Sequence, residues 1–194
     1  MCDEYFEGET FQGLSISEET IANCEFVDCQ FVDCSFENCK IIRCGFSECV
    51  FRGCTVSGLK IECSEAKFLE FDDCVLIGIN WSLLKPAGRF GSVLHKLTDC
   101  KLRYNTFSEM SFSKFSFSTS SITGSTFAEC DLSGSSFFQC DLSDTEFFKC
   151  DIRNADFREA AGYKIDVLSS RLKAARFSYP EVSNLLYSLE IKIE

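Results

Sequence analysis

The sequence predicts an all-β solenoid, a coil with four short sides and about 20 residues per turn that ends in a short α-helix. Three observations support this fold class. Large apolar residues recur every five positions, cysteines or other small residues recur two positions before them, and a helical apolar pattern follows residue 178. A period of five fits neither an amphipathic helix, which repeats every 3.6 residues, nor a strand, which alternates every two. We expect the coil to occupy residues 1–177 and the helix with its tail residues 178–194.

The five-residue repeat forms two runs. Fifteen of 16 positions in the first run carry a large apolar residue, with Ala66 the exception: Phe6, Phe11, Ile16, Ile21, Phe26, Phe31, Phe36, Ile41, Phe46, Phe51, Val56, Ile61, Ala66, Phe71, Leu76 and Trp81. All 13 positions of the second run do so: Leu97, Leu102, Phe107, Phe112, Phe117, Ile122, Phe127, Leu132, Phe137, Leu142, Phe147, Ile152 and Phe157. The runs are one residue out of phase, which predicts a loop at about 82–96 that leaves the coil and returns. After a gap at Gly162, Val167, Leu172 and Phe177 continue the pattern.

Most of the 14 cysteines follow the same period. Twelve lie two residues before an apolar centre: Cys24, Cys29, Cys34, Cys39, Cys44, Cys49, Cys54, Cys74, Cys100, Cys130, Cys140 and Cys150. We call this position the slot. Each side of the coil then has two inward residues, the centre and the smaller slot residue, and three outward ones. The slot cysteines are predicted to be small core residues and free thiols, because stacked parallel side chains do not provide the torsion of a disulfide.

The number of sides follows from a ten-residue alternation near the end of the repeat. Leu132, Leu142 and Ile152 alternate with phenylalanines, so opposite sides are alike and the number of sides is even. Four sides of five residues give a coil of 20. Like residues then stack, with Ile21, Ile41 and Ile61 in one column, and Phe31, Phe51 and Phe71 in another. Glycines two residues after a centre are predicted to form the corners.

A helix is predicted after the last repeat. Ser178 and Pro180 are favourable residues for a helix start, and four apolar residues follow on one face: Val182, Leu185, Leu186 and Leu189. This face either covers the last coil of its own chain or joins two chains as a dimer interface. We expect a homodimer.

The charge of the chain restricts its partners. The net charge is −11 and the sequence pI about 4.6, which disfavours direct binding to nucleic acid or to a membrane surface and favours a basic protein partner. Ten acidic residues and no Lys or Arg occur within residues 1–39. Four of them lie outside the inward positions and are the candidate acidic surface: Glu25, Asp28, Asp33 and Glu37. A solvated surface that only maintains solubility is the alternative.

The predicted loop is basic. It contains Lys85, Arg89, Lys96 and the single histidine, His95, and no acidic residue. It is either a tolerated surface insertion or a contact for an acidic part of a partner protein. Residues 1–10 are acidic and lack the features of a signal peptide, so a cytoplasmic location is expected.

No arrangement typical of catalysis is found. One histidine cannot form a His pair or a His-centred triad, the cysteines lack the close pairs of a zinc site, and no glycine-rich phosphate loop is present. The sequence therefore predicts a protein that is not an enzyme and needs no cofactor or metal, and that acts through its surface.

Two segments resemble the pentapeptide-repeat family: Cys130-Asp131-Leu132-Ser133-Gly134 and Ala155-Asp156-Phe157-Arg158. The resemblance extends over about residues 6–177. It implies a right-handed quadrilateral β-helix.

A narrower resemblance concerns function. Several segments are similar to the albicidin-resistance members of the family and, more distantly, to the microcin B17 and quinolone-resistance members: Gly78-Ile79-Asn80-Trp81, Tyr163-Lys164-Ile165-Asp166, Ala175-Arg176-Phe177-Ser178-Tyr179-Pro180-Glu181, Leu185-Leu186 and Ser188-Leu189. Their resemblance implies a DNA mimic that dimerises through its C-terminal helix, binds DNA gyrase or topoisomerase IV, and protects it from poisons. The alternative is a solenoid scaffold that binds another protein.

Overall fold

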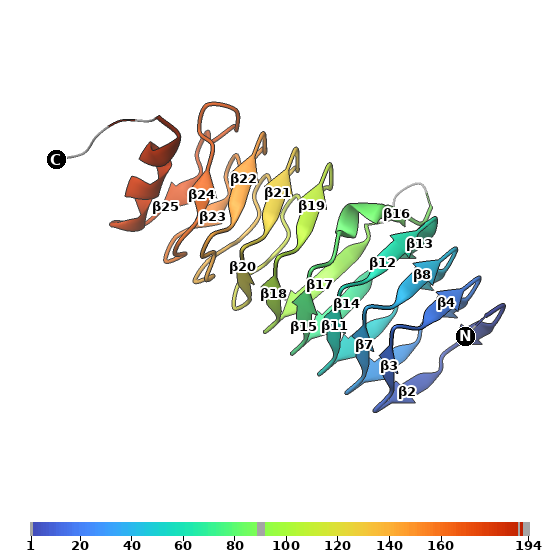
Figure 1. The fold of residues 1–194 in the computed structure, drawn as a ribbon. Coiled ribbons are helices and arrows are strands. Elements are labelled where there is room, and N and C mark those ends of the chain that lie inside the picture. The colour runs from blue at the N-terminus through green and yellow to red at the C-terminus, as the bar shows by residue number, and fades with distance from the viewer. Residues whose placement is uncertain (1, 89–91, 190, 192–194) are drawn as a thin grey trace. The chain divides into compact units, whose positions relative to one another are not determined.

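The computed structural model describes residues 2–88, 92–189 and 191, and it shows a parallel β-solenoid with short strands (Figure 1). The chain divides into two compact units, residues 1–101 and 102–194. We describe each unit by itself. Strand β18 (Lys101–Arg103) spans the boundary between them in the sequence.

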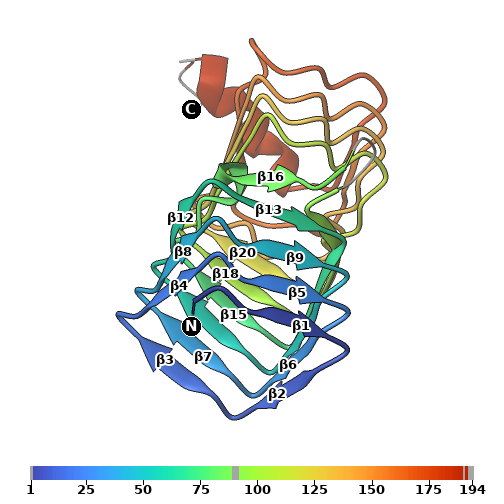
Figure 2. The same ribbon diagram turned by 90° about the vertical axis from the view of Figure 1, so that its right-hand side faces the viewer.

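The first unit has four sides, and each consists of short parallel strands from successive coils (Figure 2). Side one comprises β1 (Tyr5–Glu7), β5 (Glu25–Val27), β9 (Gly45–Ser47), β13 (Ser64–Lys67) and β16 (Leu84–Pro86). Side two comprises β2 (Thr10–Gln12), β6 (Gln30–Val32), β10 (Val50–Arg52), β14 (Leu69–Asp72) and β17 (Leu94–Thr98). Side three includes β3 (Ser15–Ser17), β7 (Ser35–Glu37), β11 (Thr55–Ser57) and β15 (Val75–Ile77). Side four comprises β4 (Thr20–Ala22), β8 (Lys40–Ile42) and β12 (Lys60–Glu62). The 3₁₀ helix η1 (Trp81–Leu83) follows β15 in the chain.

The predicted coil of 20 residues and its columns are confirmed. Ile21 pairs with Ile41, and Ile41 with Ile61, on adjacent strands. The rings of Phe31 and Phe51 stack with centroids 4.6 Å apart, and those of Phe51 and Phe71 stack 4.8 Å apart. Each buried Phe or Ile contributes about 1.5–3 kcal/mol, so the column stabilises the coil without a globular core.

The 12 slot cysteines are buried, as predicted. Most of their thiols donate hydrogen bonds to carbonyl groups of the preceding coil, as Cys34 Sγ does to Phe11 O at 3.4 Å and Cys39 Sγ to Ile16 O at 3.4 Å. The slot thiols thus bond to carbonyl groups of the strand centres one coil earlier.

The corners have left-handed backbone conformations. The predicted corner glycines Gly8, Gly13, Gly53, Gly58, Gly124 and Gly134 all have φ between 57° and 67°. Asn23, Asp28 and Asp33 occupy equivalent corners with φ of 52–53°. Asn and Asp tolerate this conformation better than other residues with a Cβ, so their recurrence two residues after a centre has the same cause as that of glycine.

The departure from the coil is shorter than the predicted loop at 82–96. Strand β16 continues side one, with Ala66 opposite Pro86, and β17 resumes side two, with Leu69 opposite Leu94. A bulge in β17 then shifts the register, because Glu70 lies opposite Lys96. Five residues inserted between β16 and β17, together with the one residue of the bulge, account for the change of phase.

The second unit has shorter strands and more isolated bridges. One sheet contains β19 (Thr106–Ser108), β21 (Thr126–Ala128), β22 (Glu146–Phe148) and β24 (Lys164–Ile165), and another contains β23 (Asp156–Phe157) and β25 (Arg176–Phe177). Strand β20 (Ser121–Thr123) is followed one coil later by the bridge between Ser121 and Asp141. The predicted column of Phe107, Phe127 and Phe147 is present, with ring centroids 4.6 and 5.0 Å apart.

The prediction that Val167 continues the apolar column is wrong. Ile165 pairs with Phe147, and Val167 is only partly buried. Gly162 has no side chain to fill its position, and the adjacent Tyr163 is fully buried, with its ring centroid 5.6 Å from that of Phe157 and 5.7 Å from that of Phe177. The chain therefore shortens this coil by two residues, and it restores the 20-residue register at the bridge between Asp151 and Arg171.

A helix forms at Glu181–Leu189 (η2), where the sequence predicts one, but it is a 3₁₀ helix rather than an α-helix. Glu181 Oε2 accepts hydrogen bonds from the Gly162 amide at 3.1 Å and from Asn184 Nδ2 at 2.9 Å. Ser188 Oγ accepts one from the Val167 amide at 3.3 Å. The two bonds from residues 162 and 167 attach both ends of the helix to the last coils of the second unit.

Candidate functional site

Charge is unequally divided between the two units. Residues 1–101 contain 17 acidic and nine basic residues, a net charge of −8, whereas residues 102–194 contain 13 acidic and ten basic residues, a net charge of −3. The first unit is therefore the more acidic one, and it contains the candidate acidic surface.

The four residues of that surface lie on one coil but on different parts of it. Glu25 begins β5 on side one, Asp28 and Asp33 occupy the next two corners, and Glu37 ends β7 on side three. All four are exposed. The structure thus distributes them around the coil as a belt and does not gather them on one face. We call Glu25, Asp28, Asp33 and Glu37 the acidic belt.

Two glycines of the following coil give room to carboxylates of the belt. A Cβ on Gly45 would overlap the carboxylate of Glu25, and a Cβ on Gly53 would lie 2.5 Å from Asp33 Oδ1. Both carboxylates therefore lie along the surface of the next coil. Glu37 additionally accepts a hydrogen bond from Ser35 Oγ at 3.3 Å.

Four carboxylates of the second unit form ion pairs within the described residues. Asp156 contacts Arg158 at 2.8 Å and Arg176 at 2.9 Å, and Asp151 contacts Arg153 at 2.6 Å. These guanidinium groups hold the pKa of both carboxyls below the usual range. Glu129 pairs with Lys149 and Asp144 with Lys164 at the surface. Within the described residues, the belt carboxylates have no such basic partner.

The sequence analysis above did not predict the Asp–Arg ion pairs, although the sequence contains a signal for them. Asp151-Ile152-Arg153 and Asp156-Phe157-Arg158 place opposite charges two residues apart around an inward centre. Side chains at i and i+2 of a strand point to the same side. The pattern therefore indicates that these two carboxylates are neutralised locally.

The basic residues of the predicted loop are located differently from what the sequence suggested. Lys85 lies in β16 opposite Glu65, and Lys96 lies in β17 opposite Glu70. His95 Nε2 is 4.0 Å from Glu70 Oε1. Lys85 and Lys96 thus belong to the sides of the coil, next to carboxylates, and Arg89 lies outside the described residues.

The predicted interface residues of the C-terminal helix are only partly covered, and in a 3₁₀ helix they form two rows, Val182 with Leu185 and Leu186 with Leu189, rather than one face. Val182, Leu185 and Leu186 are partly buried, and Leu189 is 39% exposed. Tyr187, between them, is 78% exposed. The helix therefore covers the end of its own coil only in part, and it leaves apolar surface accessible to a second molecule.

Comparison with known proteins identifies a repeat family in two segments of the chain. Its sequence signature, described as pentapeptide repeats, matches eight copies within residues 29–62 and 125–160. These two segments of the chain are pentapeptide repeats. No curated protein matches the chain.

Solved structures of pentapeptide-repeat proteins share the fold. Full-length QnrB1, a plasmid-mediated fluoroquinolone resistance protein, is 23% identical, with a TM-score of 0.54 over 98% of this chain and 99% of that one. HetL from the cyanobacterium Nostoc sp. strain PCC 7120, a protein involved in regulating heterocyst differentiation, is 12% identical, with a TM-score of 0.50 over 87% of this chain and 85% of that one. At these identities the likeness concerns the fold.

The described residues contain no group of three or more His, Cys, Asp or Glu side chains placed to hold a metal ion. Within the same residues, no helix has the length and apolar character needed to cross a membrane.

Proposed function

We propose that this pentapeptide-repeat protein is a non-catalytic, cytoplasmic DNA mimic that binds DNA gyrase or topoisomerase IV and protects it from topoisomerase poisons. The proposal rests on the narrower sequence resemblance described above and on the fold shared with QnrB1. The structural observation that carries it is the acidic belt. Its exposed carboxylates have no Arg or Lys partner among the described residues, whereas Asp151 and Asp156 of the second unit do.

Exposed carboxylates without a basic partner are available to a basic protein surface. Duplex DNA carries one negative charge per about 1.7 Å, and the first unit has a much lower charge density. We therefore expect binding to a DNA channel to be weaker than that of DNA and strongly salt-dependent, because exposed charges are screened over about 8 Å at physiological ionic strength.

The proposal includes a homodimer formed through Val182, Leu185, Leu186 and Leu189. The exposed surface of Leu189 and Tyr187 supports it, because apolar side chains left accessible beside a partly covered helix favour association. A symmetric dimer would present two acidic belts to one topoisomerase.

A gyrase supercoiling assay with and without a fluoroquinolone poison tests the function. The unmutated protein should relieve the poison and should compete with linear duplex DNA for gyrase. The variant Glu25→Gln, Asp28→Asn, Asp33→Asn, Glu37→Gln should lose most of both effects. A matched control, Glu109→Gln, Glu129→Gln, Asp144→Asn, Glu159→Gln, removes the same number of exposed charges from the second unit and should retain them.

The outcomes distinguish the proposal from the alternative. Equal loss in both variants would indicate an effect of net charge rather than of the belt. If the unmutated protein neither binds gyrase or topoisomerase IV at low salt nor alters supercoiling, the topoisomerase function is wrong. The scaffold alternative, in which the solenoid binds another protein, would then replace it, and the different role of HetL shows that the fold serves other functions.

A further inference from the structure

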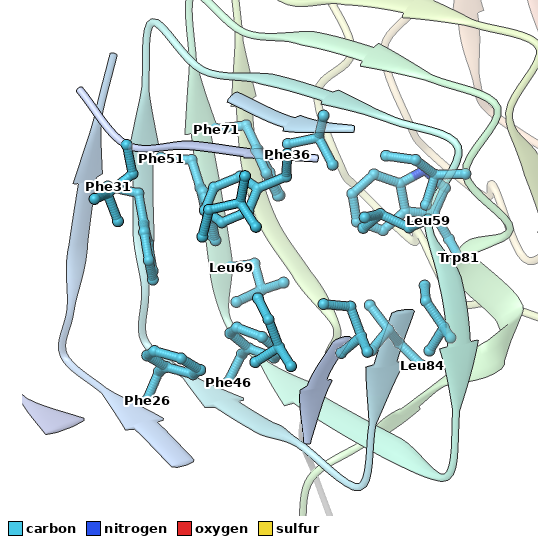
Figure 3. A pocket seen from close by; sticks show the side chains of 17 residues that line it. Phe26, Phe31, Phe36, Phe46, Phe51, Leu59, Leu69, Phe71, Trp81 and Leu84 are labelled. Carbon is cyan, nitrogen blue, oxygen red and sulfur yellow. The ribbon is translucent and has the colours of Figure 1, made fainter. Parts of the chain in front are cut away.

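The two units contain hollows of different kinds. Inside the first unit, an apolar cavity of about 70 Å³ lies among the column side chains. Figure 3 shows Phe26 and Phe31 on one side of it and Leu59 and Trp81 on the other. A cavity of about 150 Å³ holds benzene, so this space is too small for a ligand of that size. The second unit has a surface groove of about 370 Å³ that is lined by residues of β22, β24 and the helix η2.

One wall of this groove is formed by the strands beside the shortened coil. Phe147 of β22 pairs with Ile165 of β24, and Phe148 is the last residue of β22. Toward the preceding coil Phe148 lies opposite Ala128, whereas no residue of β24 lies opposite it in the following coil. The Phe148 side chain is therefore 44% exposed, and it lines the groove.

The other wall of the groove comes from the helix, through Tyr187 and Ser188. Hydrogen bonds from the Gly162 amide to Glu181 and from the Val167 amide to Ser188, at 3.1 and 3.3 Å, attach this helix to the coil. Residues three apart share a row of a 3₁₀ helix, so Tyr187 lies on the row of Glu181 and beside the two rows of the predicted dimer interface. Aromatic side chains from two attached elements thus border the groove.

Two carboxylates that line the groove have no basic partner among the described residues. Glu146 lies opposite Lys164 in the ladder, but Lys164 Nζ binds Asp144 Oδ1 instead, at 2.8 Å. Asp166 Oδ2 accepts a hydrogen bond from Ser169 Oγ at 2.6 Å. This bond holds the pKa of Asp166 below its usual range, so the carboxylate is charged at neutral pH. Because Asp144 neutralises Lys164, the groove has a net negative charge.

A cation–π contact of the Phe148 ring shows which chemistry this part of the surface supports. Lys149 Nζ lies 5.1 Å from the centroid of the ring, within the distance of about 6 Å over which an aromatic face attracts a cation. The same ammonium group pairs with Glu129 Oε1 at 3.2 Å. An aromatic face and a carboxylate therefore hold a cation together here, and the groove offers the same two kinds of group.

We propose that this groove binds an arginine side chain of a partner protein. The guanidinium plane stacks on the aromatic side chains of Phe148 and Tyr187, and its N–H groups donate to the carboxylates of Glu146 and Asp166. Arginine fits better than lysine, because its planar group is less strongly hydrated and stacks on aromatic rings. A neutral or acidic side chain lacks the complementary charge. The site is independent of the proposed topoisomerase function, since any basic partner can supply the arginine.

An NMR titration of the full chain, labelled with ¹⁵N, tests the proposal. The probes are tripeptides with blocked ends and a central arginine, citrulline or lysine; citrulline has nearly the shape of arginine without its charge. Physiological ionic strength screens the more distant exposed carboxylates over about 8 Å. The arginine peptide should shift the amide signals of Phe148, Ile165 and Tyr187. It should bind about fivefold more tightly than the citrulline peptide and about threefold more tightly than the lysine peptide.

Variants separate the charge of the groove from its aromatic surface. Glu146→Gln with Asp166→Asn should weaken binding of the arginine peptide to the level of the citrulline peptide. The matched control, Glu109→Gln with Glu159→Gln, removes two exposed carboxylates that do not line the groove and should leave binding unchanged. Tyr187→Leu should abolish the preference for arginine over lysine, because an aliphatic side chain offers no face for stacking.

Three results would overturn the proposal, and none of them requires a variant to fold. Equal binding of the arginine and citrulline peptides would show that the charge of the groove has no effect. Shifts of equal size in the acidic belt and in the groove would show unspecific attraction to exposed carboxylates. Groove signals that move with protein concentration in the absence of peptide, together with a doubled mass in light scattering, would show that a second copy of the chain covers the groove.

Discussion

The carboxylate of Glu25 lies over Gly45 on the adjacent strand, in the space that a Cβ of residue 45 would occupy. Gly162, in contrast, faces the backbone of Ser143, with a Cβ–Cα distance of 2.7 Å if a Cβ were added, and it has a φ of 75°. One glycine is therefore opposed by a mobile side chain and the other by fixed backbone.

This difference predicts opposite effects of two Gly→Ala substitutions. Gly45→Ala requires only that Glu25 move aside, so it should leave the free energy of unfolding unchanged or raise it by about 0.5 kcal/mol through a less flexible unfolded chain. Gly162→Ala should lower it by more than about 1 kcal/mol. Urea denaturation followed by circular dichroism measures both, and equal effects would contradict this interpretation of the two sites.

The buried thiols predict a loss of stability in alkali. Burial raises the pKa of Cys49 and of Cys140 from 9.0 to about 12. Thiols of the unfolded chain ionise first, so the contribution of each buried thiol to the free energy of unfolding is fully present below pH 9. Between pH 9 and about pH 12 this contribution falls, by up to about 1.4 kcal/mol per pH unit for each such thiol. Cys49→Ala should reduce this slope in urea titrations, while Cys63→Ala, at an exposed position, should not.

Asp156 predicts the complementary behaviour in acid. Its pKa is lowered by Arg158 and Arg176. Its contribution to the free energy of unfolding is therefore present above the pKa of an unfolded aspartate, and it is lost as the pH falls through the lower pKa of the folded state. Asp156→Asn should reduce the free energy of unfolding at pH 7 by about 1–3 kcal/mol, and the difference should shrink toward pH 2. Asp144→Asn, at an exposed pair, should have a smaller effect.

The C-terminal helix predicts a dimer that two substitutions disrupt. Removing a buried leucine side chain costs about 2–5 kcal/mol, so Leu185→Ala with Leu189→Ala should give monomers at micromolar concentration while the strands remain folded. Light scattering and circular dichroism check the two statements. A monomeric unmutated protein would show instead that the helix serves only as a cap of its own chain.

The five-residue period was sufficient to predict most of the fold. It gave the 20-residue coil, the columns of Ile21 and Phe31, and the burial of the slot cysteines, because each of these follows directly from which side chains point inward. It did not place Ile165 correctly, since Ile165 and Val167 are both apolar and the pattern does not distinguish them. The packing of Tyr163 into the space beside Gly162 decides the register. This packing depends on side chains far apart in the sequence, so the five-residue period does not predict it.

The candidate site was predictable in part for similar reasons. The acidic character of residues 1–39 is visible in the sequence, but the belt-like distribution of Glu25 and Glu37 depends on the corners between them. From the sequence, the phase change predicts a long loop that contains Lys85 and Lys96. In the structure the bulge in β17 absorbs one residue, and both lysines lie in strands.

The pairings on either side of the insertion make the first unit tolerant to changes in chain length. Ala66 lies opposite Pro86 on side one, and Glu70 lies opposite Lys96 on side two. Strand pairing is therefore in place both before the inserted residues and after them. Neither pairing depends on how many residues lie between. A foreign peptide inserted after Gly88 should therefore be displayed without altering the coil, which makes this position a natural attachment point for a tag or a second domain.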